Sequence, residues 1–388
     1  GAANANTVDL GAVTINGSVT GGAGSTTSNN KVNMSGTTVS GVVTGGAGSG
    51  TGNALTVKGN NRAGNIAGFQ KLTFNLGNLN RTNPMLRLTS GTATNITFGS
   101  IAFEGTPEPK VGQITLVEKS APSIHVADYA GVRGRTEGDF EYDLDTDTQT
   151  ANAKKILFDG YRFRNAVVTG AASGTDTWAG RSRIGNSTVN NRLTITGGST
   201  TNAYGGWTAG TGTTAPAAQQ NNTKDNTATL NAGTITNLYG GYTDAAAGKA
   251  TGNKVFVNGG SVTANVTGGF GGTDATDNHV TVTGGSVGGT IRGAQSAGTA
   301  HKNTVEIKGG NVHAGILGAD AAGAATENKV TTTGTVTGNI TGAKSTSGAV
   351  TKNVVTIKGN VTGNVTGGQT TGAANANTVD LGAVTING

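Results

Sequence analysis

Residues 253–277 read NKVFVNGGSVTANVTGGFGGTDATD, and residues 278–302 repeat the same pattern as NHVTVTGGSVGGTIRGAQSAGTAHK. Four further modules follow, beginning at Asn303, Asn328, Asn353 and Asn377. Successive starts therefore lie 25, 25, 25, 25 and 24 residues apart. A unit this short, with so few apolar residues, cannot bury a hydrophobic face alone and becomes stable by stacking on its neighbours. The period predicts a solenoid.

The first apolar pair of each module indicates how the solenoid is built. One residue separates Val255 from Val257, and Val280 and Val282 hold the same places one module later. Period-two alternation of β-branched residues is typical of a strand with one buried face. The i, i+3, i+4 pattern of a helix does not recur, and glycine is too frequent for helices. We predict an all-β parallel β-helix, or β-solenoid, with coils of about 25 residues in which Thr stacks on Thr and Asn on Asn.

Equivalent valines of successive modules should stack in one file, with about 4.8 Å between rungs. These are Val255, Val280, Val305, Val330, Val355 and Val379.

Composition agrees with a folded structural protein. Glycine accounts for 68 of 388 residues without the period of collagen, and charged residues make up only 12%, which argues against ordinary disorder. The net charge of +6 is spread along the chain, so nucleic acid is not an expected partner. Cysteine is absent from the sequence, and no apolar stretch of about twenty residues predicts a membrane span. We expect any export or anchoring segment to lie outside these residues.

The two ends of the sequence share a long identity. Residues 1–17 and residues 372–388 both read GAANANTVDLGAVTING, which gives a super-repeat of 371 residues. One interpretation is a window on a longer array of near-identical units. The other is that the overlap arises from how a segment of a filament was delimited. Both interpretations predict a polymer or a giant repeat protein, with further copies of the same repeat as end-to-end partners.

The pattern divides the chain into three parts. Residues 1–60 and 166–388 carry the short repeats, whereas residues 61–165 contain longer apolar strand segments and most of the phenylalanines. Within this middle part, residues 140–144 and 156–158 are predicted to form a hairpin closed by the polar loop 145–155. The middle part is interpreted either as wider coils or as a β element that protrudes from the solenoid.

A family resemblance rests on two stretches. One is the module Asn-x-Val-x-Ile-x-Gly-Gly that closes with Tyr-Gly-Gly-(Tyr/Trp), as at residues 239–242, and the other begins at residues 67–74 and continues to residues 141–144. Both resemble the passenger regions of bacterial autotransporter-type surface proteins and adhesins. The resemblance spans nearly the whole chain and implies a β-helix displayed outside the outer membrane, hence an extracellular location on the bacterial cell surface. Later modules depart from it by losing the tyrosine.

Residues with catalytic or metal-binding potential are few. Asp143, Asp145 and Asp147 have the spacing of an EF-hand opening, but Thr148 and Lys154 stand where that motif has glycine and glutamate, so they are only weak calcium candidates. The carboxylates around Phe140 alternate with apolar residues, as one face of a strand does unaided. We predict no enzyme, no cofactor and no metal site.

Aromatic residues in the closing motifs are the remaining candidates for ligand contact. They are predicted to be exposed, where they could stack on sugar rings or anchor a partner protein, or else cap the coil interior. The main candidates are Trp178, Tyr204, Trp207, Tyr239 and Tyr242, accompanied by Phe256 and Phe270.

Taken together, these patterns favour an extracellular structural protein that forms a long, stiff bacterial surface fibre by end-to-end stacking. The first alternative is an adhesin that binds a host or microbial glycan or protein through the aromatic-rich residues 61–270. The second is a polysaccharide-degrading β-helix.

Overall fold

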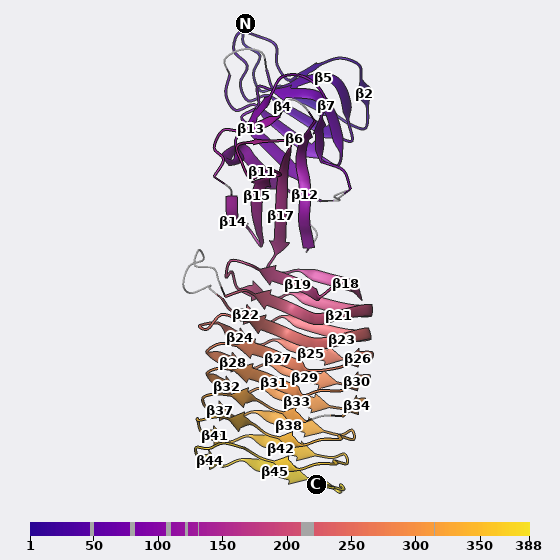
Figure 1. The fold of residues 1–388 in the computed structure, drawn as a ribbon, viewed down its shortest axis with the longest axis vertical. Helices are drawn as coiled ribbons and strands as arrows, with labels where there is room; N and C mark the ends of the chain where they lie inside the picture. The colour runs from indigo at the N-terminus through magenta and orange to yellow at the C-terminus, as the bar shows by residue number, and fades with distance from the viewer. Residues whose placement is uncertain are drawn as a thin grey trace. The chain divides into compact units, whose positions relative to one another are not determined.

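The chain is all-β and forms two compact units. The computed structural model describes residues 1–46, 50–77, 82–105, 110–120, 123–130, 132–210, 221–313 and 315–388. Unit 1 comprises residues 1–137 and 141–161, and unit 2 comprises residues 138–140 and 162–388. Both units are drawn in Figure 1.

Unit 2 is a stack of coils, each built from short strands that pair in parallel with the same strands of the next coil. The first strands are β25 (Lys254–Val257), β29 (His279–Val282), β33 (Thr304–Ile307), β38 (Lys329–Thr332), β42 (Val354–Ile357) and β45 (Thr378–Leu381). The second strands are β26 (Ser261–Val262), β30 (Ser286–Val287) and β34 (Asn311–Val312). The third are β27 (Val266–Gly271), β31 (Ile291–Ser296), β35 (Ile316–Leu317), β36 (Asp320–Ala321), β39 (Ile340–Thr341), β40 (Lys344–Ser345) and β43 (Val365–Thr366). The fourth are β28 (Asp274–Thr276), β32 (Thr299–His301), β37 (Ala325–Thr326), β41 (Val350–Thr351) and β44 (Ala374–Asn375).

The earlier coils of unit 2 contain two longer strands, β21 (Arg192–Thr208) and β23 (Thr227–Thr243). The other strands of these coils are β18 (Val167–Ala172), β19 (Asp176–Ser182), β20 (Thr188–Val189), β22 (Thr223–Lys224) and β24 (Lys249–Thr251). The single strand β23 pairs with β25, β26 and β27, so one continuous strand in its coil corresponds to three separate strands in the next coil. The strands of unit 2 run as successive layers in Figure 1.

The predicted valine file is confirmed. Val255 pairs with Val280, Val280 with Val305, and the register continues to Val379. The first five valines of the file are fully buried in one apolar cluster inside the coils. This cluster forms because each strand turns its alternate β-branched side chains inward, where they pack on the same side chains one coil away.

A buried asparagine ladder runs beside the valine file. Within unit 2 its members are Asn191, Asn226, Asn253, Asn278, Asn303, Asn328, Asn353 and Asn377. Each Nδ2 donates to the Oδ1 of the next member at 2.7 to 3.0 Å. The same Oδ1 also accepts the backbone N–H of the preceding member. The expected stacking of Asn on Asn is therefore confirmed, and it satisfies amides that burial would otherwise penalise.

The closing glycine pair leaves room for the asparagine side chains of the ladder. A Cβ built on Gly269 would collide with the side chain of Asn278, which opens the next coil. Replacing this glycine by any other residue would push the amide away from its ladder partner Asn303. The Gly-Gly motif is thus a packing requirement as well as a turn signal.

A left-handed residue precedes the ladder asparagines. Lys302, Glu327 and Lys352 have φ of 55°, 58° and 57°, and Gly252 has φ of 66° at the same place. This conformation suits glycine and is unfavourable for residues with a Cβ. The backbone there is set by the ladder and by the pairing on either side, so the coil imposes the conformation on whatever residue occupies the position.

Exchange of residues at this position should change stability in opposite directions. We expect Lys352→Gly to stabilise unit 2 by about 0.5 to 1 kcal/mol, because relief of left-handed strain exceeds the greater chain entropy of glycine. Gly252→Ala should destabilise it, since the new Cβ would be strained and would contact Asp225. Denaturant unfolding of both variants measures the difference. A lower free energy of unfolding for Lys352→Gly would contradict the explanation.

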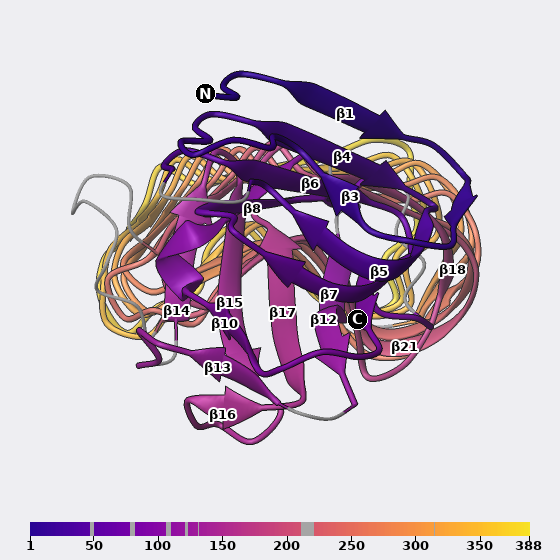
Figure 2. The same ribbon diagram turned by 90° about the horizontal axis from the view of Figure 1, so that it is seen from above.

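Unit 1 begins with parallel coils of the same kind. The first strands are β1 (Thr7–Leu10), β4 (Lys31–Ser35), β6 (Ala54–Lys58), β8 (Lys71–Asn75) and β11 (Ile101–Glu104). The second are β2 (Thr14–Ile15), β3 (Val19–Thr20), β5 (Thr38–Thr44), β7 (Asn61–Ala67), β9 (Leu86–Leu88) and β12 (Lys110–Lys119). In a third set, β10 (Thr94–Ile96) pairs in parallel with β13 (Ile124–Val126), and β13 pairs antiparallel with β16 (Asn152–Ala153). The 3-10 helix η1 (Phe98–Ser100) follows β10. Figure 2 shows β1, β4, β6 and β8 in succession.

The rest of unit 1 leaves the parallel pattern. β14 (Val132–Glu137), β15 (Phe140–Thr146) and β17 (Lys155–Arg162) are consecutive in one sheet, and β17 pairs antiparallel with β12. β15 and β17 are neighbours, as the predicted hairpin requires. The observed connection is shorter than the predicted loop 145–155, because β15 continues to Thr146 and β17 begins at Lys155. This connection also contains β16, which pairs antiparallel with β13.

Candidate functional site

The aromatic candidates lie on consecutive coils of unit 2. Trp178 on β19 pairs with Tyr204 on β21, which pairs with Tyr239 on β23. Trp207 and Tyr242 pair in the same way, and Phe270 on β27 continues their file. We call these six residues the aromatic stack. The neighbouring Ala203, Leu238 and Val266 belong to the apolar cluster inside the coils, whereas the six rings do not.

The rings of the aromatic stack contact one another closely. Tyr204 and Tyr239 are stacked with centroids 5.2 Å apart and planes 11° apart. Tyr242 and Phe270 are stacked at 4.7 Å and 18°, and Tyr204 lies 5.1 Å from Trp207. Offset and edge-to-face contacts of this kind add stability beyond the burial of area. The stack therefore bridges coils as well as presenting a surface.

Arg181 completes the stack at one end. Its guanidinium carbon lies 4.3 Å from the ring centroid of Trp207 and 4.7 Å from that of Trp178. Both distances fall within the range of cation–π attraction. Sequence reasoning missed this residue, although Arg181 holds in its own module the place that Trp207 and Tyr242 hold in the next two.

The prediction that these aromatics are exposed is wrong for two of them. Trp178 is 8% exposed and Tyr204 is 6% exposed, because rings of neighbouring coils lie against them. Trp207, Tyr239 and Tyr242 are half-buried. Burial raises the pKa of the Tyr204, Tyr239 and Tyr242 hydroxyls above the usual value. What reaches solvent is the edge of a packed stack rather than a row of free rings.

The aromatic stack is confined to four coils. Phe256, which the sequence grouped with it, lies on β25 between Thr229 and Thr281 and belongs to a different file. Beyond the stack, the file of Tyr239 continues as Thr267 and then as residues 292, 317, 341 and 366. Arg292 there forms an ion pair with Asp320 at 3.4 Å.

The three weak calcium candidates bind protein groups. Asp143 accepts the backbone N–H of Gly134 at 2.7 Å, and Asp147 accepts two backbone N–H groups at 3.1 Å. Asp145 accepts hydrogen bonds from Arg133 and Tyr129. Burial alone would raise the pKa of Asp145, but these bonds outweigh it and the pKa is lowered. The carboxylates border a pocket of about 190 Å³ in unit 1.

No group of three or more His, Cys, Asp or Glu side chains is placed to hold a metal ion anywhere in the described ranges of the chain. The same ranges contain no helix long and apolar enough to cross a bilayer.

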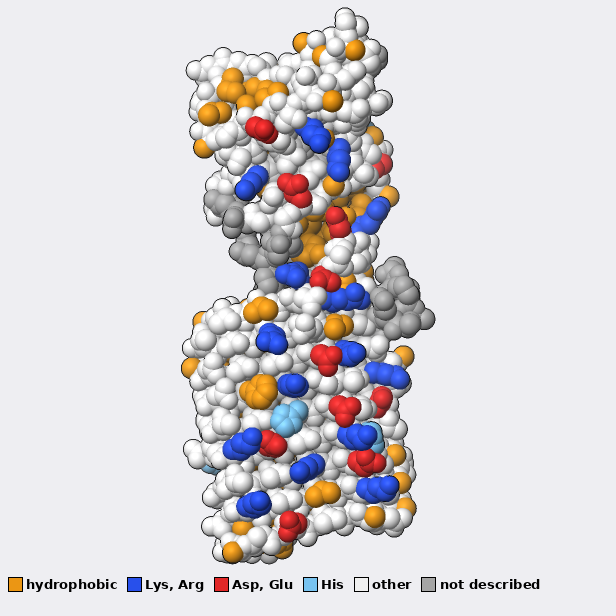
Figure 3. Space-filling view, turned by 180° about the vertical axis from the view of Figure 1, so that it is seen from behind, with side chains coloured by type: hydrophobic (Ala, Val, Ile, Leu, Met, Phe, Trp, Pro, Cys, Tyr) orange, Lys and Arg blue, Asp and Glu red, His pale blue; other side chains and the backbone are white. Residues whose placement is uncertain are grey.

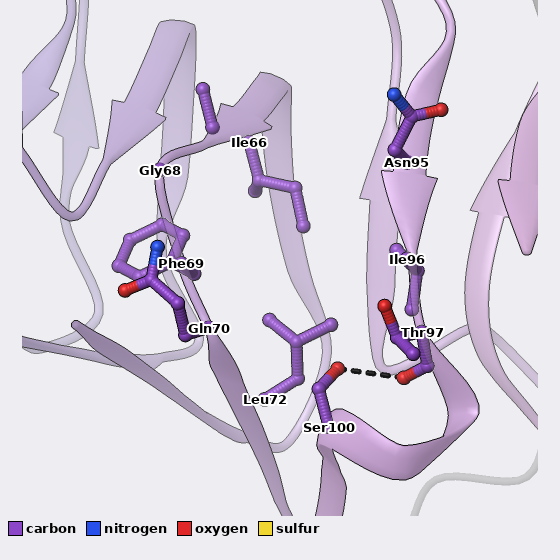
Figure 4. A pocket seen from close by; sticks show the side chains of 10 residues that line it. Ile66, Gly68, Phe69, Gln70, Leu72, Asn95, Ile96, Thr97 and Ser100 are labelled. Carbon is purple, nitrogen blue, oxygen red and sulfur yellow. Dashed lines mark hydrogen bonds between the residues drawn. The ribbon is translucent and has the colours of Figure 1, made fainter. Parts of the chain in front are cut away.

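A second pocket of unit 1, of about 240 Å³, lies between residues 66–72 and residues 95–100. Figure 4 shows Ile66, Leu72 and Ile96 beside it, together with the hydrogen bond from Ser100 Oγ to the Thr97 carbonyl at 2.6 Å. Its lining contains no ionisable side chain. The pocket therefore offers shape and amide groups but no general acid or base.

The outer surface of unit 2 carries charges of both signs. Lys, Arg, Asp and Glu side chains are interspersed over the face shown in Figure 3. One pair, Lys308 and Glu306, lies at 2.8 Å, and the hydrogen bond from Lys308 contributes most to lowering the pKa of Glu306. Such pairs on a solvated face contribute little to stability individually.

Comparisons with known proteins leave the family open: no family model, no curated protein and no solved structure matches this chain.

Proposed function

We propose that this chain is a structural protein that supplies the length and stiffness of an extracellular fibre on a bacterial surface. The observation that carries the proposal is the asparagine ladder, which joins every coil of unit 2 from Asn191 to Asn377 without interruption. The parallel strands and the valine file follow the same direction. The cell-surface location rests on the resemblance of the modules to autotransporter-type passenger regions.

A stack of this kind resists bending and stretching for a physical reason. Each coil contacts only its neighbours, so length is added without changing the contacts already made. Backbone hydrogen bonds and ladder bonds both run from coil to coil, and separating two coils breaks all of them together. Such a rod needs no catalytic residue. Repetition of the 17-residue sequence at 371 residues supports continuation of the rod into further copies.

Electron microscopy of the native material tests the proposal. We expect thin, unbranched filaments with a regular axial repeat. At about 4.8 Å per coil of about 25 residues, one 371-residue unit adds roughly 70 Å, and less if residues 61–165 protrude. Discrete globular particles with both ends closed by a helix or loop would contradict the fibre function.

The aromatic stack favours a second candidate function, that of an adhesin. Aromatic edges beside Arg181 could bind the apolar face of a sugar ring or a partner protein. Trp178 and Trp207 are the only two tryptophans in the sequence, so the intrinsic fluorescence of the whole protein reports on this stack. A saturable fluorescence change with a glycan or host surface protein, lost in Trp207→Ala, would support binding. An unchanged spectrum throughout a glycan and protein panel would leave the rod as the better account.

A further inference from the structure

Unit 1 has an asparagine ladder of its own, which stops at Gln70. Asn30 donates its N–H and Nδ2 to Asn53 Oδ1, at 2.9 and 3.2 Å. Asn53 in turn donates its N–H to Gln70 Oε1 at 2.9 Å, so a glutamine takes the acceptor role in that coil. The register of β11 with β8, continued toward the N-terminus, places Gly99 opposite Gln70. Because glycine has no side chain, the next coil contributes no member to the ladder.

The chain opposite Gln70 also leaves the extended conformation, because residues 98–100 form the 3-10 helix η1. The N–H groups of Phe98 and Gly99 donate to the Asp128 carboxylate at 2.7 and 3.0 Å, which holds the first turn of this helix in place. The pocket of about 240 Å³ in unit 1 is lined in part by Gln70 and by residues of the same helical segment. The pocket therefore lies where a ladder member is missing.

Polar groups without protein partners border the pocket. Among the described residues, no hydrogen bond is made by Gln70 Nε2, by the side-chain amide of Asn95 or by the Thr97 hydroxyl. Figure 4 shows Phe69 and Gln70 on one side of the pocket, and Asn95 and Thr97 on the other. Two amides and a hydroxyl supply both donors and acceptors. A ligand that carries several hydroxyl groups can pair with all three side chains.

The pocket also has an apolar wall. Ile66, Leu72 and Ile96 line it and are buried. Phe69 is half-buried, and a Cβ built on Gly45 would come within 2.8 Å of its Cδ1, so the ring packs closely on that coil. A sugar ring has hydroxyl groups at its edge and C–H groups on its faces, and such a face packs well on an aromatic ring. The combination of wall and amides therefore fits a sugar.

Charge and size narrow the ligand further. The lining contains no ionisable side chain, so a phosphate, carboxylate or ammonium group would enter without a counter-charge and would lose hydration. The volume of about 240 Å³ lies below the range of about 300 to 1,000 Å³ that is typical of pockets for drug-sized ligands. The pocket thus suits one uncharged ring rather than a chain of several.

We propose that this pocket of unit 1 binds one neutral sugar ring, which forms hydrogen bonds with Gln70, Asn95 and Thr97 and packs a C–H face on Phe69. The sugar hydroxyls thereby take the role that the side chain of a ladder member plays in other coils. This activity goes beyond the fibre function, and it does not depend on the aromatic stack, which belongs to unit 2.

Saturation-transfer difference NMR on the whole protein tests the pocket. The probes are the methyl glycosides of glucose, galactose, mannose and N-acetylglucosamine, with N-acetylneuraminic acid as the charged comparison. We expect saturable transfer to at least one neutral glycoside, with a Kd on the order of 1 mM, because the ligand is small and well hydrated when free. The charged sugar should bind at least about tenfold more weakly.

Two variants locate the binding. Asn95→Ala removes a hydrogen-bonding amide, and Phe69→Leu removes the aromatic face but keeps an apolar side chain, so each should raise the Kd at least about fivefold. Asn95 is exposed, so its variant should fold normally. Asn258→Ala changes an exposed asparagine of unit 2 and is the matched control, while Trp207→Ala removes part of the aromatic stack. Both of these variants should bind the sugar as the parent protein does.

Three results would overturn the pocket: no transfer to any neutral glycoside, a preference for the charged sugar, or unchanged binding by both Asn95→Ala and Phe69→Leu. Loss of binding in Trp207→Ala alone would assign the sugar to the aromatic stack instead. None of these results depends on filaments, so the fibre function is tested separately by microscopy. A disaccharide that ends in the preferred sugar identifies its source, because binding of the disaccharide indicates the end of a glycan and its exclusion indicates a free monosaccharide.

Discussion

Val305→Asp is expected to unfold unit 2 or to destabilise it by about 4 kcal/mol or more. Val305 is fully buried between Val280 and Val330, in the middle of the apolar file. A carboxylate there would lose its hydration and would meet only apolar side chains, so it would either remain charged at high cost or bind a proton. Urea or guanidinium unfolding followed by circular dichroism measures the loss.

The adjacent residue supplies the matched control. Thr304 is half-buried on the opposite face of β33, between His279 and Lys329. We expect Thr304→Asp to change the free energy of unfolding by no more than about 0.5 kcal/mol, because the new carboxylate stays hydrated beside a lysine. Equal unfolding midpoints for the two aspartate variants would refute the assignment of inner and outer faces.

Asn303→Leu should be the second most damaging change, at about 3 kcal/mol or more. The leucine removes the acceptor of the Asn278 N–H and Nδ2, and it removes the Nδ2 that donates to Asn328 Oδ1 and to the Ala275 carbonyl. Each group is buried, so water cannot replace the lost bonds without opening the stack. The free energy of unfolding in denaturant measures the effect.

An asparagine outside the ladder provides the comparison. Asn258 is exposed, and its Nδ2 donates to Asn231 Oδ1 at 3.0 Å on the surface of unit 2. Since water can take over that bond, Asn258→Leu should cost no more than about 0.5 kcal/mol. If Asn303→Leu were equally mild, the ladder would not be what holds the coils together.

The sequence alone determined the coil, because its signal is repeated and local. Alternation at Val255 and Val257 fixes which side of a strand faces inward, and the 25-residue period brings the same side chains of the next module onto them. Parallel pairing in register is then the arrangement in which every module buries the same face. The valine file and the stacking of asparagines followed from these two facts.

Only the tertiary structure decided which side chains of neighbouring coils bury one another and where the repeating strand pattern ends. The burial of Trp178 and Tyr204 depends on rings 26 to 35 residues away, which alternation within one strand does not report. The antiparallel pairing of β12 with β17 joins segments that share no repeat, so no period could reveal it. In a periodic sequence, the repeat itself indicates which strands pair. In an aperiodic segment, the pairing partners are decided by packing and hydrogen bonding in the folded chain.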